Sequence, residues 1–201
     1  MVSIAVFASG KGTNFDHIAQ YFASSGIGVV KLLIFDQKDA PCTLLAEKRN
    51  IPTVFIDYKT SGKENAELHI LEIIQKEKIQ LCVLAGFMRI LSQSFIQHSG
   101  IPVINIHPSL LPEYKGINSI ARAYNGNTTY TGITIHFVNE RIDDGEIIFQ
   151  KSILIDRTKT VDDLEKLIHH IEYENYPVVI EKICRTIEKK GDNNGKLSIT
   201  R

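Results

Sequence analysis

The chain has 201 residues, of which 43% are apolar and 23% are charged, and its formal net charge at pH 7 is +0. This length can form one large α/β domain, and a neutral chain without basic runs argues against a general nucleic-acid-binding protein. No apolar stretch is long enough to span a membrane, and the N-terminus lacks the basic start of a secretory signal.

The first half of the chain alternates apolar runs with helical patterns. The apolar runs are rich in Val, Ile and Leu, which is typical of parallel strands buried on both faces. They predict strands at residues 2–8, 29–35, 53–56, 81–84 and 103–106. The intervening patterns predict helices at residues 14–23, 41–49, 65–78 and 92–98. This alternation implies right-handed crossovers and a doubly wound sheet.

The second half adds two extended runs and a long helix. Residues alternate in polarity at 131–138, and a second extended run follows at 147–155, which predicts an antiparallel addition and hence a mixed sheet. The last helix is predicted to begin at Thr160, a capping residue followed by acidic residues. Pro177 should kink or restart this helix, because proline has no N–H and clashes with the preceding turn.

No internal repeat or linker divides the sequence, which predicts a single α/β domain over residues 1–190 with helices on both faces of a mostly parallel sheet. Residues 191–201 are polar, contain two glycines and are expected to form a flexible tail. The three cysteines are too widely spaced for a disulfide framework or a zinc site, which predicts small core residues in a reducing cytoplasm. They are Cys42, Cys82 and Cys184.

The stretch SGKGTN, at residues 9–14, directly follows the first expected strand. Its glycines permit close approach of the backbone, and the helix after it offers free N–H groups and a partial positive charge. A dinucleotide fingerprint would need glycine at Phe15, and the Walker A spacing does not fit. The turn therefore favours a single phosphate, with Thr13 and Asn14 as further donors; the alternative is an ordinary tight turn.

A second constellation lies at residues 103–116, VINIHPSLLPEYKG, where a strand enters a proline-rich loop. Asn105 and His107 are two residues apart, so both point to one side at the carboxyl edge of the sheet, where α/β folds bind ligands. An amide and an imidazole can stabilise an oxyanion and move a proton, and Asp143 beside His107 would favour the imidazolium. The alternatives are a capped strand end with a hydrogen-bonded histidine and a simple Asp-Asp-Gly turn.

Five motifs in order resemble the phosphoribosylglycinamide formyltransferase family, the glycinamide ribonucleotide transformylases of purine synthesis. The resemblance extends to about residue 190 and implies a Rossmann-like formyltransferase fold. NIHPSLLP with a later aspartate is specific to folate-dependent formyltransferases, and the SGxGTN start narrows this to the purine branch. The motifs are SGKGTN at 9–14, VLAGFMRIL at 83–91, NIHPSLLP at 105–112, TGITIHFV at 131–138 and DDG at 143–145.

The resemblance implies transfer of a formyl group from 10-formyltetrahydrofolate, as co-substrate, to the amine of glycinamide ribonucleotide, without a metal. Asn105 and protonated His107 would stabilise the tetrahedral oxyanion. Asp143 would keep His107 charged and help to pass the proton from the amine to the folate nitrogen. Together with the composition, this predicts a cytoplasmic enzyme, monomer or homodimer, that takes small-molecule substrates and has no nucleic-acid or membrane partner.

The resemblance also implies residues for both ligands. The 5′-phosphate would be held by Gly12, Thr13 and Asn14, with Lys63 as a basic residue on the phosphate side. Glu172 would contact the sugar or the amino end of the substrate. The pteridine would be lined by apolar and loop residues, for which core packing is the alternative. These are Met88, Arg89, Ile90, Leu91, Val138, Glu140 and Arg141.

Parts of the sequence depart from the family pattern. Residues 117–120, INSI, replace a histidine-bearing stretch, which weakens any role for a second histidine there. Residues 36–40, DQKDA, also depart from the pattern, at a place where no direct chemistry is expected. His136 is expected to be structural, and His169, one helical turn before Glu172, could face the substrate.

Other activities compete with this interpretation. A formyltetrahydrofolate hydrolase shares the trio but normally carries an N-terminal regulatory domain, and this sequence opens directly on its first expected strand. Formyltransferases that act on an amino-sugar nucleotide or on methionyl-tRNA carry further C-terminal segments. A non-catalytic nucleotide-binding module would explain the glycine turn but would leave Asn105, His107 and Asp143 without a task.

Overall fold

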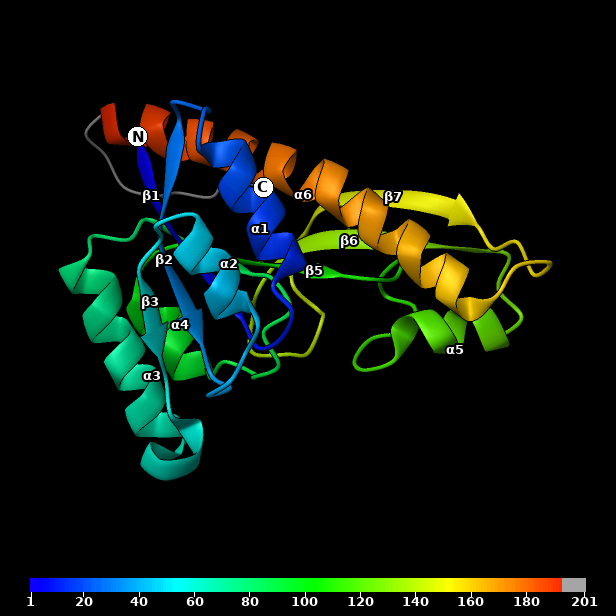
Figure 1. Cartoon of the computed structure of the whole chain (residues 1–201), viewed down its shortest axis with the longest axis horizontal. Coiled ribbons are helices and arrows are strands. Elements are labelled where there is room, and N and C mark those ends of the chain that lie inside the picture. Colours follow the sequence, from blue (N-terminus) through cyan, green and yellow to red (C-terminus); the bar gives the residue numbers. More distant parts are fainter. Residues whose placement is uncertain (193–201) are drawn as a thin grey trace.

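The computed structural model describes residues 1–192, which form a seven-stranded sheet flanked by helices (Figure 1). The strand order is β3-β2-β1-β4-β5-β6-β7; β1 to β5 are parallel, whereas β6 and β7 each run antiparallel to the preceding neighbour. The predicted mostly parallel mixed sheet is thus confirmed. The strands are β1 (Val2–Ala8), β2 (Gly28–Phe35), β3 (Thr53–Phe55), β4 (Leu81–Leu84), β5 (Val103–His107), β6 (Tyr130–Phe137) and β7 (Ile147–Leu154).

The helices agree with the predicted pattern except in three places. The short helix α5 was not predicted, α3 begins earlier than expected, and α6 continues through Pro177 instead of restarting there. Within α3, Gly62 has a φ of 74° and joins two helical pieces across a kink. The helices are α1 (Thr13–Phe22), α2 (Cys42–Lys48), α3 (Tyr58–Lys76), α4 (Gln93–Ser99), α5 (Ser119–Asn125) and α6 (Val161–Asp192).

The central strand β1 is buried on both faces, as its unbroken apolar sequence predicts. Ile4 and Val6 belong to a core cluster shared with α1 and α6, whereas Ala5 and Phe7 belong to a second cluster shared with α3 and α4. The alternation follows from the two-residue period of a strand. Helices therefore cover both faces of the sheet, which confirms the prediction.

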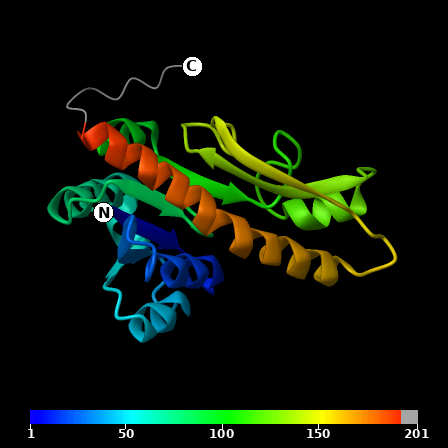
Figure 2. The same cartoon turned by 90° about the horizontal axis from the view of Figure 1, so that it is seen from above.

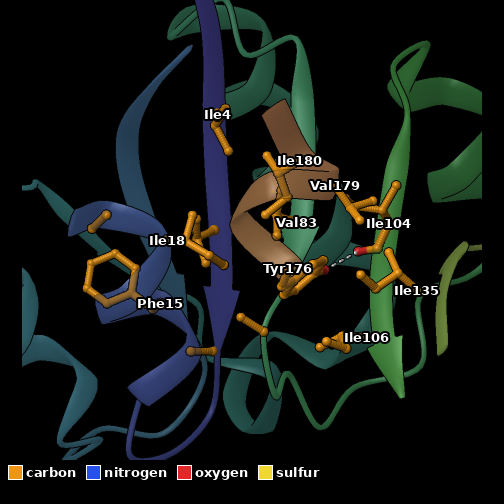
Figure 3. Close-up of a cluster of buried hydrophobic side chains, with 14 of the residues drawn as sticks. Ile4, Phe15, Ile18, Val83, Ile104, Ile106, Ile135, Tyr176, Val179 and Ile180 are labelled. Carbon is orange, nitrogen blue, oxygen red and sulfur yellow. Dashed lines mark hydrogen bonds between the residues drawn. The ribbon is translucent and has the colours of Figure 1, made fainter. Parts of the chain in front are cut away.

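The long helix α6 packs against elements from both halves of the chain. It runs along almost the full length of the molecule (Figures 1 and 2) and packs against α1, α5, β1 and β6. Tyr176, on the side of α6 that faces the sheet, is fully buried, and its hydroxyl lies 2.9 Å from the Leu84 carbonyl oxygen and 3.4 Å from that of Ile104. Figure 3 shows the contact with Ile104. Tyr176, Val179 and Ile180 thereby fix α6 over the centre of the sheet.

Three loops leave the carboxyl ends of adjacent parallel strands. They are the glycine turn after β1, residues 85–92 after β4, and residues 108–118 after β5. Because β1, β4 and β5 are neighbours in the sheet, these loops meet at one edge. This is the edge at which doubly wound sheets bind ligands.

Three predictions about the rest of the chain can be compared with the structure. The three cysteines are buried and free, as predicted. Among residues 1–192, no helix is both long and apolar enough to cross a membrane. The expected tail at 191–201 lies outside the described residues, apart from Gly191 and Asp192 at the end of α6.

Candidate active site

The antiparallel pairing of β5 and β6 places Asn105 opposite His136 and His107 opposite Thr134. The Nδ2 atom of Asn105 lies 3.4 Å from Nε2 of His136, while Nδ1 of His136 lies 2.8 Å from the Phe137 carbonyl oxygen. A carbonyl can only accept, so Nδ1 carries the proton and Nε2 is free to accept from Asn105. His136 therefore orients the Asn105 amide, in keeping with the supporting role expected for it.

Asp143 joins the predicted trio from the loop after β6. One carboxylate oxygen lies 3.3 Å from Nδ1 of His107 and accepts from the Gly116 N–H at 2.8 Å. Its other oxygen lies 3.7 Å from Nε2 of His136. Asp143 adopts a positive φ of 49°, which is uncommon outside glycine. The structure thus brings the three residues of the trio together around His136.

Burial and hydrogen bonding act in opposite directions on His107. Burial lowers the pKa of His107, and the charge of Asp143 only partly offsets this. Yet Nε2 lies 3.0 Å from the Tyr114 carbonyl and Nδ1 faces the carboxylate, so only the imidazolium supplies a donor to each. Burial thus opposes the imidazolium that the resemblance implied, whereas Asp143 and the Tyr114 carbonyl favour it.

Asp143 itself is kept ionised. Burial alone would raise the pKa of Asp143, but the neighbouring His136 ring, the Gly116 N–H and the nearby His107 lower it below its ordinary value. A carboxylate that stays ionised near neutral pH can accept a proton or stabilise an imidazolium.

The loop after β5 is held by side chains that the sequence did not single out. The Thr134 hydroxyl donates to the Ser109 carbonyl at 2.6 Å and accepts from the Leu111 N–H at 3.0 Å. The Gln150 amide donates to the Leu111 carbonyl and to Thr134, both at 2.9 Å. Thr134 is fully buried opposite His107, so the two antiparallel strands fix the loop that follows the catalytic candidate.

The glycine turn leaves the start of α1 uncapped by any side chain. Gly12 occupies the cap position with a φ of 73°, and the first N–H groups of α1 remain for another acceptor. A Cβ at Gly12 would lie 2.4 Å from Cβ of Cys42, so this glycine is required for packing against α2 as well as for its backbone conformation.

Asn14 and Glu172, expected at the substrate, lie in contact. The Asn14 amide donates to the buried Glu172 carboxylate at 2.9 Å, and His169 lies 3.0 Å from the same oxygen. One of the two N–H groups of the Asn14 amide is therefore occupied, which leaves the other one and the backbone N–H for a phosphate. The buried Asn14 Oδ1 has no hydrogen-bond partner, so this oxygen and Glu172 present acceptors suited to hydroxyl or amino groups.

His169 offers a test of this cluster through the pH dependence of stability. The hydrogen bond to Glu172, followed by the charges of Glu172 and Glu165, raises the pKa of His169 above its ordinary value of 6.5. A raised pKa in the folded state stabilises the fold fully below the unfolded value, and this contribution is lost as the pH rises through the folded value. We expect His169→Asn to lower the Tm more at pH 6 than at pH 9.

Thermal unfolding of both proteins at the two pH values checks this expectation. His170→Asn, at an exposed neighbouring position on α6, controls for the removal of a histidine from the helix. A Tm difference of equal size at pH 6 and pH 9 would contradict the contact between His169 and Glu172.

The expected folate residues divide into two groups. Met88 is 72% exposed and Ile90 is 56% exposed, whereas Leu91 is buried. Arg89 is held by Asp36, with 2.5 Å between Nε and the carboxylate, so its side chain is engaged within the protein. Val138 is half-buried, and its N–H donates to the Val103 carbonyl at 2.8 Å.

The three remaining predicted residues are charged. Glu140 and Arg141 are exposed on the loop before Asp143, and Arg141 lies 3.5 Å from Asp144. The Lys63 ammonium is half-exposed on α3, 4.0 Å from Glu67. Within residues 1–192, no hydrogen bond or ion pair joins Lys63 to the glycine turn. That part of the described chain also contains no cluster of three His, Cys, Asp or Glu residues arranged to hold a metal ion.

Comparison with known proteins identifies the family. The family model of formyl transferases matches residues 2–180. The chain is also 37% identical over 185 residues to the phosphoribosylglycinamide formyltransferase of Bacillus subtilis (strain 168), which covers 91% of this chain and 95% of the relative. The chain belongs to the phosphoribosylglycinamide formyltransferase family.

Further members of this family are similar in sequence and in structure. The Haemophilus influenzae phosphoribosylglycinamide formyltransferase is 36% identical over 183 residues, which are 90% of this chain and 86% of the relative. The crystal structure of glycinamide ribonucleotide transformylase 1 from Geobacillus kaustophilus superposes with a TM-score of 0.87 at 35% identity, covering 92% of this chain and 99% of that one. The phosphoribosylglycinamide formyltransferase fold is therefore shared over nearly the whole chain.

Proposed function

We propose that the protein transfers the formyl group of 10-formyltetrahydrofolate to the amine of glycinamide ribonucleotide. The observation that carries the proposal is the convergence of Asn105, His107 and Asp143 at the carboxyl edge of the sheet in a member of this family. An amide donor, an imidazole and an ionised carboxylate are the groups that acyl transfer to an amine requires.

The trio can be assigned separate tasks. As the substrate amine attacks the formyl carbon, Asn105 donates its second N–H to the formyl oxygen while His136 holds the amide in place. The negative charge growing on that oxygen favours the imidazolium form of His107, whose positive charge stabilises it. Asp143 accepts the proton that the amine loses, and the proton departs with the folate nitrogen when its bond to the formyl carbon breaks.

The glycine turn and α6 support a site for the ribonucleotide. The uncapped N-terminus of α1 at Gly12, Thr13 and Asn14 suits a phosphate, because its N–H groups and helix dipole attract an anion. Glu172 and the Asn14 Oδ1 then offer acceptors to the sugar hydroxyls or to the amino end. Binding at the phosphate would hold the amine near the formyl carbon.

Exposed apolar side chains at the same edge of the sheet support a site for the folate. Met88 and Ile90 follow β4, and Ile142 stands next to Asp143. Large apolar side chains exposed together beside reactive groups suit a flat, largely apolar ligand that buries them on binding. We assign the pteridine contacts to these side chains and to the backbone of residues 88–91 and 138–141.

The decisive experiment is a choice of substrates. The purified protein is given 10-formyltetrahydrofolate alone, with glycinamide ribonucleotide, or with an amino-sugar nucleotide, and tetrahydrofolate release is followed. Rapid release only with glycinamide ribonucleotide is expected, because the phosphate site and the trio must be occupied together. Release without an acceptor would favour a hydrolase, and release only with the sugar nucleotide would favour another formyltransferase.

The remaining parts of the proposal concern the protein as a whole. The formyltransferase domain is assigned to residues 1–190, and the active unit to a monomer or a homodimer. The proposed chemistry needs no metal, so the rate should be unchanged after incubation with EDTA.

A further inference from the structure

The segment between β4 and α4 presents alternate side chains to opposite sides. It has no helix or strand structure, yet Phe87 and Leu91 are buried and Met88 and Ile90 are exposed. Arg89 lies between the two exposed residues and points inward to Asp36. Residues 86–91, called the β4–α4 segment below, therefore expose two apolar side chains because Arg89 between them and Phe87 and Leu91 on either side are anchored.

Several anchors hold the ends of the β4–α4 segment. The Ser9 N–H donates to the Gly86 carbonyl at 3.0 Å, and the Ser9 hydroxyl accepts from the Met88 N–H at 2.8 Å. Phe87 packs edge-to-face on Phe7, with ring centroids 5.4 Å apart. The Ser92 N–H donates to the buried Glu67 carboxylate at 3.0 Å. The middle of the segment depends on Arg89.

Asp36 provides the anchor for Arg89. It directly follows β2, its side chain is 0% exposed, and its Oδ2 lies 2.5 Å from Nε of Arg89. The guanidinium also lies over the ring of Tyr58, 5.0 Å from its centroid. Within the described residues, the Asp36 carboxylate accepts one further hydrogen bond, from the Gln37 side-chain amide at 3.2 Å. A carboxylate buried to this degree is tolerated because the cation is held against it.

Asp36 and Arg89 are 53 residues apart in the sequence and sit on different loops of the same sheet edge. If the carboxylate loses its charge, the guanidinium is released toward solvent, because its side chain is already 37% exposed. The backbone on both sides of Arg89 then loses its central restraint, and Met88 and Ile90 lose a fixed orientation. A ligand that needs both side chains in place would bind more weakly, since ordering them becomes part of the cost of binding.

We propose that Asp36 is a positioning residue for folate binding: through Arg89 it fixes the β4–α4 segment so that Met88 and Ile90 face the ligand. The inference rests on the proposed function for the identity of the ligand. It assigns a role to Asp36, the first of residues 36–40, where the sequence departs from the family pattern and no direct chemistry was expected.

Asp36→Asn tests the proposal with two readouts. In the free protein, amide hydrogen exchange in the β4–α4 segment should become faster. In the full reaction, the KM for 10-formyltetrahydrofolate should rise roughly tenfold, below the roughly 100-fold that a 1 Å misplacement of a reacting group can cost. The KM for glycinamide ribonucleotide should change by less than about twofold, since its site is assigned to α1 and α6.

Asp16→Asn is the matched control. Asp16 forms a pair with Arg49 at the same 2.5 Å distance, on α1 and away from the β4–α4 segment. This control should leave both the exchange of the segment and the folate KM unchanged. If Asp36→Asn behaves like Asp16→Asn in both readouts, or raises both KM values together with a lowered Tm, the positioning role is overturned.

The variant Arg89→Lys covers the case in which Asp36→Asn does not fold, and the wild-type reaction tests the proposed function separately. If Asp36→Asn does not fold, Arg89→Lys keeps the positive charge but loses the planar guanidinium over Tyr58, and should show smaller changes in the same two readouts. Unchanged readouts in Arg89→Lys would then overturn the proposal. Wild-type protein without formyl transfer would refute the proposed function, and the exchange comparison would still decide whether Asp36 orders the segment.

Discussion

His107→Ala and Asp143→Ala are each expected to lower kcat by about 100-fold or more, the usual cost of losing one group that stabilises a developing oxyanion. Both residues lie in one network with Asn105 and His136, so each single change removes most of what the network contributes. The double variant should therefore be far less impaired than the product of the two single effects. Steady-state kinetics with both substrates varied gives the comparison.

Asp144→Asn is the control for these variants. Asp144 neighbours Asp143 but is partly exposed and pairs with Lys115 and Arg141. Removal of its charge should leave kcat within about twofold of the wild type, because surface ion pairs contribute little. Binding of glycinamide ribonucleotide, measured by calorimetry, should be largely retained in His107→Ala and Asp143→Ala. Near-normal kcat in either variant would refute the mechanism.

Gly145→Ala is expected to lower kcat by about 100-fold although it removes no functional group. A Cβ at this position would lie 1.7 Å from the Phe137 carbonyl oxygen, so the backbone of the loop has to move. Asp143 is two residues away and contacts His107 and the Gly116 N–H over short distances, and a displacement of about 1 Å can cost a rate factor of about 100.

A double variant shows whether Gly145→Ala acts through Asp143. Once the carboxylate has been removed, its displacement no longer matters, so Gly145→Ala with Asp143→Ala should be little slower than Asp143→Ala alone. Circular dichroism and Tm measurements confirm that the compared proteins are folded. If the two rate losses multiply, Gly145 affects catalysis by another route.

The strands that the sequence predicted best are those at the centre of the sheet. The bounds of β1 and β4 agree with the prediction because both strands are apolar and buried, and such runs leave few alternatives. The short helix α5 was missed because the seven residues SIARAYN are too few to show a helical period and follow an irregular loop. The restart predicted at Pro177 does not occur: α6 continues through it, since packing against the sheet compensates for one lost backbone hydrogen bond.

The sequence predicted which residues form the candidate site but not which of them contact one another. The side chains of Asn105 and His107 point to the same side of β5, and the two-residue period of a strand is enough to predict this. The contact of His136 with Asn105 depends on the register of β5 and β6, and no local pattern specifies that register. Pairs such as Asp36 with Arg89 join distant loops, and only the assembled sheet brings their charges together.

The hydrogen bond between Asn14 and Glu172 can form only late in the synthesis of the chain. These residues are 158 positions apart, and Glu172 lies on α6, which is synthesised after all the strands of the sheet. Asn105, His107 and Asp143 are all made earlier, so a nascent chain can carry the trio before it has the acceptor that we propose for the sugar or amino end of the substrate. Contacts between such distant residues also form slowly. Docking of α6 is thus expected to be the step that converts a nearly folded chain into an enzyme that can hold its nucleotide.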